Sequence, residues 1–514
     1  MNVVYLIGAG PGDPGLITVR GQQCLASADV VLYDHLVPPR LLRHARPDAE
    51  KIDVGGPAPQ EQEQEAICYL LAEKAREGKT VARLKWGDPF VFDRGGSEAL
   101  FLHEQGVRFE VVPGVPAGIA VPSYAGVPTT YPGGGDTLTF VRGHEDEGKS
   151  RTSIDWASLA RLDGTIVCYA GPRQLPNVVS SLLSHGRPGE DSAAVVYDGT
   201  LPTQKTLTGS LDEIAKTIAQ SEERRPAVLV VGRVAALREH LRWFDARPLF
   251  GKRVLVTRPR EQAAELCERL EMMGAEAIEA PMIRVVPPED FAPLDAACAR
   301  VGTFDWIIFP SANAVEAFMR RLMAGPRDLR SLGVVKLCTV GPATGERLAR
   351  FGLKVDLLPA EYRAEGVLRA LSEVVGDVRG LKILLPHADI GREIVAEELR
   401  KQGAEVTDVV AYRTIAVEAE REGDEPDVYR MLLDHRIDVV TFTSASAVNG
   451  FVRLLGREPA ADLLSGTVVA SIGPVTAEAA AQFHIKTTII PASYTIPALV
   501  DAIVEYFQKT SVET

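Results

Sequence analysis

The second half of the chain contains an internal repeat, which limits its possible folds more than any other feature of the sequence. Three segments recur in the same order at offsets of 129 to 133 positions: residues 253–277 as 382–406, residues 304–322 as 437–455, and residues 339–362 as 471–494. A segment repeated at a fixed spacing is normally one structural unit. The repeat therefore predicts two similar lobes.

Each copy of the repeat alternates short apolar runs with amphipathic stretches, which predicts a parallel α/β lobe. Ligands of such sheets bind beyond the carboxyl ends of the strands, where the FxSAxAV and VGPxT turns of this sequence lie. Together with the helix N-termini that follow, small polar residues of these turns could bind a carboxylate: Ser311, Asn313, Thr344, Ser444, Ser446 and Thr476. Each could equally be a helix cap that binds no ligand.

The first half shows the same α/β alternation, up to about Phe244, but no repeat. Residues 245–251 include Pro248 and Gly251, and a new strand is expected from Lys252. The 514 residues also require more than one core, at roughly 100–200 residues per domain. We therefore expect two independently folded parts joined by a linker.

The net charge of the chain and the spacing of its cysteines disfavour several classes of partner and of cellular location. The formal charge of −13 disfavours nucleic acid and anionic membranes as partners, and no apolar run reaches the ~18 residues that span a bilayer. The six cysteines are scattered singly, which is typical of free thiols in a reducing compartment. Because the first residues also lack a signal-peptide pattern, we expect a soluble cytoplasmic protein. No zinc-site spacing occurs, so we expect no bound metal.

The segment GAGPGDP, residues 8–14, follows the first expected strand, where a dinucleotide-binding loop would lie. It fails that pattern because the third glycine position holds Asp13, and because Pro11 and Pro14 remove backbone donors at the start of the next helix. A nicotinamide cofactor is therefore disfavoured. The turn either lets the backbone approach a flat ligand closely or is no more than a tight turn after the first strand.

Five blocks of the first half resemble, in order, the signature blocks of the uroporphyrinogen-III C-methyltransferase family: residues 4–21, 28–37, 83–96, 111–127 and 140–145. The resemblance covers about residues 1–244. It implies two α/β lobes that bind S-adenosylmethionine between them, and two methyl transfers that convert uroporphyrinogen III to precorrin-2. It also implies a homodimer formed through this half.

The resemblance assigns roles to particular positions. Asp34 matches the residue proposed to accept the proton that leaves after methylation, although it could instead hydrogen-bond within the loop after the second strand. The positions matched to cofactor binding are Pro11, Gly87, Asp88, Val91, Pro116, Ala117, Ala170 and Gly199.

The first half also departs from the family pattern. Trp86 and Asp93 stand where the family usually has glycine, and Gly56 stands where a proton-donating lysine is expected. Pro116 and Ala170 occupy positions often held by a small hydroxyl residue and a methionine. If the lysine is essential, this half is altered or inactive. The intact GAGPGDP and GDPFVF blocks favour a variant that still methylates.

Residues 253 to about 507 resemble uroporphyrinogen-III synthase through the motifs VTRP, FPSANAV, VGPAT, AYRT, FTSASAV and IGPVT. The resemblance implies that hydroxymethylbilane is closed to uroporphyrinogen III with loss of water and inversion of the last ring. Tyr412 matches the tyrosine suspected of assisting departure of the hydroxyl, and a core or hinge role is equally open. The candidates for binding the substrate carboxylates are the turn residues named above, with Arg258, Arg392 and Arg413.

These observations predict an α/β chain. A two-lobed tetrapyrrole-methylase fold is expected at 1–244 and a two-lobed synthase of flavodoxin-like parallel-sheet lobes at 252–508. The expected boundaries are lobes of about 1–112 and 113–244, a linker at 245–251, a synthase lobe of about 252–286 plus 416–508, a second of about 287–415, and a tail at 509–514.

Two other interpretations remain open. The first half could methylate another tetrapyrrole and be fused to a two-lobed module that only binds or senses tetrapyrroles. Alternatively, the second half could be a solute-binding protein, which the cysteine pattern and the lack of a signal peptide disfavour. The sequence does not indicate whether the product enters sirohaem, cobalamin or haem synthesis.

Overall fold

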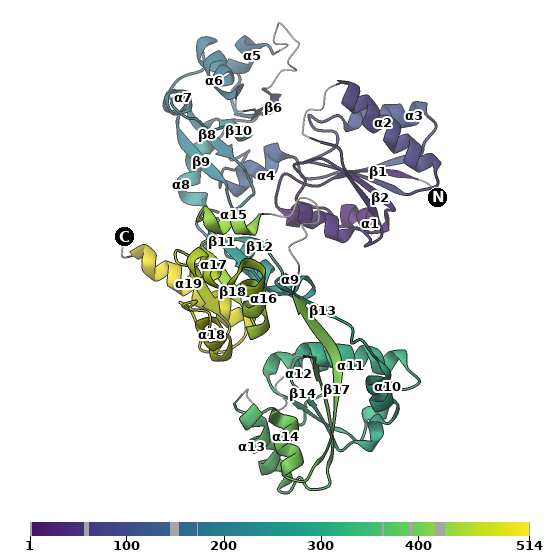
Figure 1. The fold of residues 1–514 in the computed structure, drawn as a ribbon. Coiled ribbons are helices and arrows are strands. Elements are labelled where there is room, and N and C mark those ends of the chain that lie inside the picture. Colours follow the sequence, from purple (N-terminus) through teal and green to yellow (C-terminus); the bar gives the residue numbers. More distant parts are fainter. Residues whose placement is uncertain are drawn as a thin grey trace. The chain divides into compact units, whose positions relative to one another are not determined.

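The computed structural model describes residues 3–55, 61–143, 154–171, 173–361, 364–389, 394–416 and 427–512. The chain divides into two compact units (Figure 1). The first contains Met1–Gly251 with Met273–Glu276, and the second contains Lys252–Met272 with Ala277–Thr514.

The first lobe of the first unit is a parallel sheet in the order β3-β2-β4-β1-β5. Apolar side chains of α1 and η2 cover one face, and those of α2 and α3 cover the other (Figure 1). The elements are β1 (Val4–Gly8), η1 (Pro14–Leu16), α1 (Val19–Ser27), β2 (Val30–Tyr33), η2 (Pro39–His44), β3 (Glu50–Asp53), α2 (Glu61–Arg76), β4 (Val81–Lys85), α3 (Gly95–Glu104) and β5 (Phe109–Val112).

The second lobe of this unit has a mixed sheet in the order β6-β7-β10-β8-β9. Strands β6 and β7 are parallel, and the other three pairs are antiparallel. The elements are α4 (Ala117–Tyr124), β6 (Leu138–Arg142), α5 (Trp156–Ala160), β7 (Thr165–Ala170), α6 (Leu175–Ser184), β8 (Ser192–Tyr197), β9 (Lys205–Ser210), α7 (Leu211–Ala219), β10 (Ala227–Val231), η3 (Arg233–Leu237) and α8 (Arg238–Leu241).

Residues 245–251, expected to be a linker, form packed turns of the first unit. The Leu249 side chain is fully buried, and its backbone N–H donates to the Met273 carbonyl at 2.9 Å. The Arg247 guanidinium lies 4.8 Å from the Trp243 ring centroid and 4.9 Å from that of Phe244. Apolar and cation–π contacts therefore fix a segment whose composition resembles a free connector.

The first lobe of the second unit is a four-stranded sheet in the order β12-β11-β18-β19, in which β18 is parallel to both β11 and β19. Its elements are β11 (Arg253–Val256), α9 (Arg260–Met272), β12 (Glu276–Glu279), α15 (Val428–Leu433), β18 (Val439–Phe442), α16 (Ala445–Leu455), α17 (Arg457–Leu463), β19 (Val468–Ser471), α18 (Pro474–Ala481) and α19 (Ile496–Val512). Helix α19 reaches Val512, so residues 509–512 are helical rather than part of a tail.

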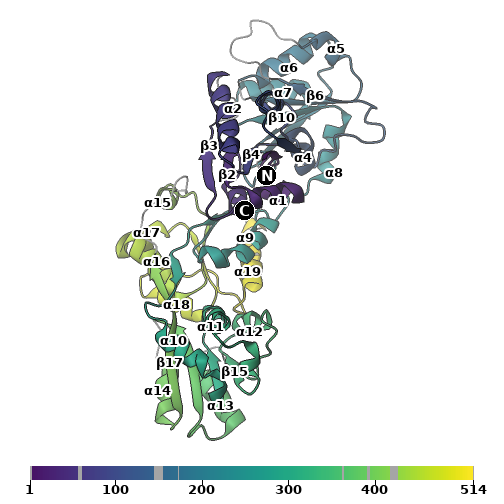
Figure 2. The same cartoon turned by 90° about the vertical axis from the view of Figure 1, so that its right-hand side faces the viewer.

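The second lobe of this unit has a sheet in the order β13-β17-β16-β14-β15. Its pairs are parallel except β13 with β17; the 12-residue β17 can be followed in Figures 1 and 2. The elements are β13 (Ile283–Val286), α10 (Ala292–Ala299), η4 (Val301–Thr303), β14 (Trp306–Phe309), α11 (Ala312–Ala324), η5 (Leu329–Leu332), β15 (Lys336–Thr339), α12 (Pro342–Ala349), α13 (Ala364–Val375), β16 (Lys382–Ala388), α14 (Ile394–Lys401) and β17 (Glu405–Ala416). Strand β13 was expected in the other lobe, within 252–286, but pairing with β17 places it here.

The internal repeat is visible in the packing of both lobes. In one copy the rings of Phe309 and Phe318 pack edge to face with centroids 5.6 Å apart. In the other, Phe442 and Phe451 do the same at 5.4 Å. Each pair joins a strand to the following helix, so the repeated residues build the same strand–helix unit twice.

Two further observations concern the described chain as a whole. All six cysteines are buried, and none of them forms a disulfide bond. Among the described residues, no helix combines the length and the apolar character that crossing a bilayer requires.

Candidate functional site

Three loops of the first unit meet at the carboxyl ends of β1, β4 and β5. The backbone N–H groups of Gly10 and Gly87 each donate to the carbonyl of the other, at 3.2 and 2.9 Å. A Cβ atom added to Gly114 would lie 2.2 Å from the Gly87 carbonyl oxygen and 2.7 Å from the Gly8 Cα. The loops therefore touch backbone to backbone, which explains why glycine occupies these positions.

Asp88 links two of these loops. Its Oδ1 accepts the Phe90 backbone N–H at 2.8 Å, and its Oδ2 accepts that of Gly114 at 3.0 Å. The carboxylate thus holds the loop after β4 against the loop after β5. A carboxylate can accept about four hydrogen bonds, so capacity for a ligand remains.

The loop after β4 also contacts the second lobe. The Phe92 ring packs edge to face on Tyr169 with centroids 5.1 Å apart, and the Tyr169 hydroxyl accepts the Gly118 N–H at 2.7 Å. Trp86 packs against the apolar cluster around Ala117. Phe92 has a φ of 54°, a strained conformation for a bulky residue.

Further contacts join the two lobes at the first loop. The Asp13 N–H donates to Thr200 Oγ1 at 3.0 Å, and the Tyr124 hydroxyl donates to Asp13 Oδ2 at 2.7 Å. Gly199 is packed so tightly that a Cβ there would lie 2.3 Å from the Val121 side chain. Of the other predicted cofactor positions, Pro11 is buried after β1, Val91 is half-buried after β4, Pro116 precedes α4, Ala117 begins α4 and Ala170 ends β7.

Asp34 follows β2 and is 9% exposed. Its Oδ1 accepts Nη2–H of Arg83 at 2.5 Å, and its Oδ2 accepts the Trp86 backbone N–H at 3.2 Å. Both oxygens are therefore engaged within the protein.

Arg83 begins a buried array of charges. Arg83 and Lys85 lie two positions apart on β4, and each is 1% exposed. The fully buried Glu98 of α3 accepts from both through Oε1, from Arg83 Nε at 3.2 Å and from Lys85 Nζ at 3.0 Å. Lys85 Nζ also lies 3.1 Å from Asp93 Oδ1. The array therefore runs Asp34, Arg83, Glu98, Lys85, Asp93, with alternating sign.

Burial and pairing set the pKa values of the acids in this array. Burial alone would raise the pKa of Glu98, but Arg83 and Lys85 together lower it. The pKa of Asp93 is raised, chiefly by burial, although Lys85 opposes the shift. Lys85 is thus committed to the interior as the partner of Glu98 and Asp93.

In the second unit, Ser311 and Tyr412 come together. Ser311 caps α11 by accepting the Ala314 N–H at 3.2 Å, and its Oγ also lies 3.1 Å from the Tyr412 hydroxyl. Tyr412 comes from β17 and is 8% exposed. Burial raises the pKa of Tyr412, while hydrogen bonds with Ser311 and Asn313 oppose that shift. The phenol is therefore protonated at neutral pH.

A contact that the sequence did not predict joins the two lobes beside this pair. Gln262 Nε2 on α9 donates to Asn313 Oδ1 on α11 at 2.5 Å. Gln262 Oε1 in turn accepts from Arg258 Nε at 3.3 Å. Arg258 is half-buried and makes no ion pair with a carboxylate of the described residues. Burial lowers the pKa of Arg258; the charge of Glu265 opposes this shift, and that of Arg347 adds to it.

Among the remaining turn residues, Ser444 fits the capping alternative, whereas Thr344 and Thr476 do not cap their helices, because the N-cap positions of α12 and α18 are Gly341 and Gly473. Ser444 caps α16 by accepting the Ala447 N–H at 3.1 Å. Thr344 and Thr476 are 5% and 4% exposed in the first turns of α12 and α18. Within the described part of the chain, no hydrogen bond connects these residues to the pair of Ser311 and Tyr412.

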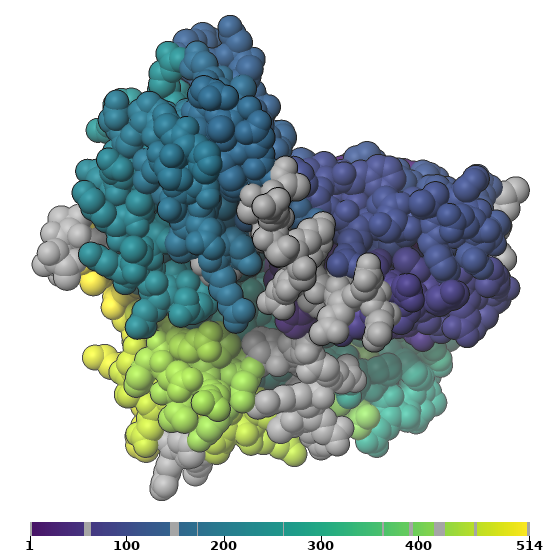
Figure 3. Space-filling view, turned by 90° about the horizontal axis from the view of Figure 1, so that it is seen from above, coloured from purple at the N-terminus to yellow at the C-terminus, as the bar shows by residue number. Residues whose placement is uncertain are grey.

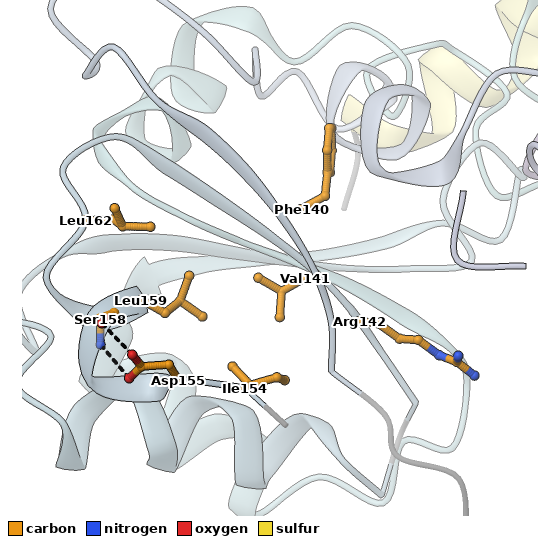
Figure 4. A pocket seen from close by; sticks show the side chains of 8 residues that line it. All are labelled: Phe140, Val141, Arg142, Ile154, Asp155, Ser158, Leu159 and Leu162. Carbon is orange, nitrogen blue, oxygen red and sulfur yellow. Dashed lines mark hydrogen bonds between the residues drawn. The ribbon is translucent and has the colours of Figure 1, made fainter. Parts of the chain in front are cut away.

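A cavity of about 420 Å³ lies elsewhere, between β6 and α5 of the first unit (Figure 4). Its apolar lining includes Val141, Ile154 and Leu159, while Asp155 and Ser158 are hydrogen-bonded to each other at the start of α5. None of the predicted site residues lines it.

Comparison with known proteins identifies both halves. Residues 3–215 match the model of the tetrapyrrole (corrin/porphyrin) methylases, and residues 264–501 match that of uroporphyrinogen-III synthase HemD. The porphyrin biosynthesis protein HemD of Ruminiclostridium josui is 36% identical over 98% of this chain and 97% of its own length. The chain belongs to this HemD family. Its halves are hereafter the methylase half and the synthase half.

Two further proteins are similar to parts of this chain. The uroporphyrinogen-III C-methyltransferase of Bacillus subtilis is 37% identical over 70% of this chain and 73% of its own length. The uroporphyrin-III C-methyl transferase of Thermus thermophilus, solved with S-adenyl homocysteine, is 37% identical over 46% of this chain and 99% of its own length, with a TM-score of 0.40.

Three other predicted residues remain: Arg413, Gly56 and Arg392. Arg413 is ion-paired with Glu289 and donates to the Pro287 carbonyl, so it fastens β17 to the segment after β13. Gly56 and Arg392 lie outside the described residues. Among the described residues, no group of three or more His, Cys, Asp or Glu side chains is placed to hold a metal ion.

Proposed function

We propose that this HemD protein catalyses two consecutive steps of tetrapyrrole biosynthesis. The synthase half closes hydroxymethylbilane to uroporphyrinogen III, with loss of water and inversion of the last ring. The methylase half then methylates uroporphyrinogen III twice to precorrin-2. The observation that carries the proposal is the relative from R. josui, because its likeness extends over nearly the full length of both chains. Both family models also match in the same chain, one in each half.

The loops of the methylase half suit S-adenosylmethionine, a ligand that the backbone must approach closely. Gly10 and Gly87 have φ values of 76° and 71°, which bring main-chain groups to the loop surface without side chains. When bound, this cofactor supplies a methyl group on a sulfonium. The residues that would hold it are Pro11, Gly87, Asp88, Val91, Pro116, Ala117, Ala170 and Gly199.

The protein's own task in methylation is to orient the macrocycle and to remove a proton once a ring carbon has taken the methyl group. Asp34 is the residue matched to this role. Its bond to the buried Arg83 holds the carboxylate in one orientation. The same bond equally fits a structural role, in which Asp34 is the partner of Arg83.

In the synthase half, catalysis is largely orientation of a flexible polycarboxylate chain. The protonated Tyr412, held by Ser311, is suited to hydrogen-bond the departing hydroxyl group. Arg258 is suited to bind a substrate carboxylate, because its charge faces no carboxylate of the described residues within ion-pair distance. The caps at Ser311 and Ser444 leave other N–H groups of the first helical turns for anions, and Thr344 and Thr476 lie in the equivalent turns.

One incubation tests both activities. The purified full chain is given hydroxymethylbilane with or without S-adenosylmethionine, and the products are separated by isomer and mass. We expect uroporphyrinogen III without the cofactor and its dimethylated product with it. Formation of the type I isomer alone would overturn the synthase assignment. Unmethylated uroporphyrinogen III in the complete mixture would overturn the methylase assignment.

We also infer a homodimer formed through the methylase half. Tyr69 on α2 and Leu100 on α3 are 59% and 60% exposed, which is apolar area available to a second copy. The surface of their lobe is coloured purple to blue in Figure 3. Light scattering during gel filtration should give twice the chain mass of 55.5 kDa; the mass of one chain would contradict the inference. The buried cysteines form no disulfide bond, which accords with a cytoplasmic location.

A further inference from the structure

A series of hydrogen bonds crosses from one lobe of the synthase half to the other, from Arg258 to Tyr412. Arg258 Nε donates to Gln262 Oε1 at 3.3 Å, and Gln262 Nε2 donates to Asn313 Oδ1 at 2.5 Å. The Asn313 side chain hydrogen-bonds Tyr412, whose hydroxyl also lies 3.1 Å from Ser311 Oγ. The series therefore joins the cation and the phenol that we propose to act on the substrate.

The chemistry of the four groups fixes the direction of donation along this series. A guanidinium has donors only, so Arg258 must face the carbonyl oxygen of Gln262. The amide nitrogen of Gln262 then donates to Asn313 Oδ1, and the amide nitrogen of Asn313 is left to donate to the Tyr412 oxygen. A phenol oxygen that accepts a hydrogen bond still has its own O–H to donate. The series thus directs the Tyr412 proton away from Asn313.

The only part of Tyr412 that packing does not fix is the rotation of its hydroxyl group. The ring lies in the core of its lobe, beside Phe309 and Phe318. Ser311 Oγ is held by the Ala314 N–H at 3.2 Å, and a hydroxyl oxygen can accept a second hydrogen bond. The Tyr412 O–H can therefore donate to Ser311 or to a departing hydroxyl. Donors in series also polarise one another, which strengthens the last donor.

The internal repeat separates the needs of the fold from those of this contact. Ser311 and Ser444 are equivalent, at an offset of 133, and both cap helices. The same offset places Ser446 at the position of Asn313, and Ser446 is exposed. An equivalent strand–helix unit thus forms with serine at this position. The amide of Asn313 is not needed for the unit to fold.

We propose that Gln262 and Asn313 are positioning residues for cyclisation, which orient the Tyr412 hydroxyl and link it to the carboxylate site at Arg258. The proposal rests on the proposed function of the synthase half. Both amides act through Tyr412, which hydrogen-bonds the departing hydroxyl. Because Gln262 lies on α9 and Asn313 on α11, the phenol is oriented only while the two lobes are together.

The first test compares Gln262→Met with Gln402→Met in the full chain. Methionine keeps nearly the length of glutamine and removes the amide, and Gln402 is an exposed glutamine directly after α14. Steady-state assays follow uroporphyrinogen III formation from hydroxymethylbilane. We expect Gln262→Met to lower kcat about 3- to 10-fold while KM changes less than about 3-fold. Gln402→Met should change neither constant, and both variants should melt within about 2 °C of wild type.

A double-mutant cycle distinguishes positioning from a general loosening of the lobes. If Gln262 acts through the phenol, Tyr412→Phe and the double variant Gln262→Met/Tyr412→Phe should have kcat values within about 2-fold of each other. Asn313→Ser, which introduces the residue of the other copy, should lower kcat as Gln262→Met does. Gln262→Glu should lower kcat and also raise KM, because a carboxylate pairs with Arg258 but cannot donate to Asn313.

Two results would overturn the proposal. One is a normal kcat in both Gln262→Met and Asn313→Ser. The other is a loss from Gln262→Met that is as large in the Tyr412→Phe background as in wild type. Failure of the wild-type chain to form uroporphyrinogen III would instead overturn the proposed function of the synthase half.

Discussion

The two halves place buried cations in opposite surroundings. In the methylase half, Arg83 and Lys85 each contact two carboxylates inside one lobe. In the synthase half, Arg258 contacts the amide of Gln262 and has the charges of Glu265 and Arg347 nearby, but no carboxylate of the described residues lies within ion-pair distance. A cation that is fully paired inside the fold acts as structure, whereas one that lacks an acid is available to an anionic ligand. The same residue type therefore has a different role in each half.

Removing the paired cation should have the largest effect. Arg83→Met leaves Asp34 and Glu98 buried without their main partner, so it should lower the free energy of unfolding of the methylase half by about 3–5 kcal/mol. Urea unfolding measures this loss. The matched control is Arg20→Met, whose pair with Glu110 is roughly half exposed, so its loss should be far smaller than that of Arg83→Met. Equal losses in the free energy of unfolding would contradict the structural role assigned to the buried, paired Arg83.

Removing the unpaired cation should affect catalysis rather than stability. Arg258→Met should leave the free energy of unfolding within about 0.5 kcal/mol of wild type or raise it, because a desolvated charge disappears. It should lower kcat/KM for cyclisation about 10- to 100-fold, since hydrogen bonds to charged groups contribute about 1.5–3 kcal/mol. The control is Arg413→Met, whose cation is already paired with Glu289. A normal kcat/KM in Arg258→Met would refute the ligand role.

A smaller effect is expected at the phenol of the synthase half. Tyr412→Phe keeps the ring in the core and removes only the hydroxyl that contacts Ser311, so kcat for cyclisation should fall about 10-fold with little change in KM. Steady-state assays of both constants test this. Tyr429→Phe is the control, because Tyr429 is exposed on α15. An unchanged kcat would favour a purely structural role for Tyr412.

The smallest effect should come from an ion pair nearer the surface of the methylase half. The hydrogen bonds from Arg225 lower the pKa of Glu223 to about 2. Because the folded-state pKa lies below the unfolded value, this pair stabilises the fold above about pH 4.5 and loses that contribution as the pH falls towards 2. Glu223→Gln should therefore lose less in melting temperature than wild type between pH 5 and pH 2.5. If the melting temperatures of the two proteins fell equally between pH 5 and pH 2.5, the stabilising role of the pair of Glu223 and Arg225 would be contradicted.

The sequence predicted features that depend on local residues. The repeat indicated the equivalent strand–helix units, and their turn residues Ser311 and Ser444 both cap helices. The end-to-end resemblance also indicated the α/β architecture of both halves, as the family matches show. Such features follow from short-range patterns and from motifs that keep their order.

Features that depend on tertiary packing could not be predicted. Gln262 and Asn313 are 51 positions apart and meet only because α9 and α11 bring them together from different lobes. Lys85 is an ordinary strand-end lysine in the sequence, and only the packing of Glu98 of α3 against it shows that its charge is internal. In the same way, the antiparallel pairing of β13 depends on the distant strand β17.

Each lobe contains at least one buried cysteine, whose reaction with an alkylating reagent requires that lobe to open. Cys24 and Cys68 belong to the first lobe of the methylase half, Cys168 to its second, Cys267 to the first lobe of the synthase half, and Cys298 and Cys338 to its second. Burial raises the pKa of Cys168 and Cys338 to about 12 and that of Cys298 to about 11, so hardly any reactive thiolate exists in the closed state. The rate at which an alkylating reagent labels each cysteine, resolved by peptide mass spectrometry, therefore measures how often that lobe opens.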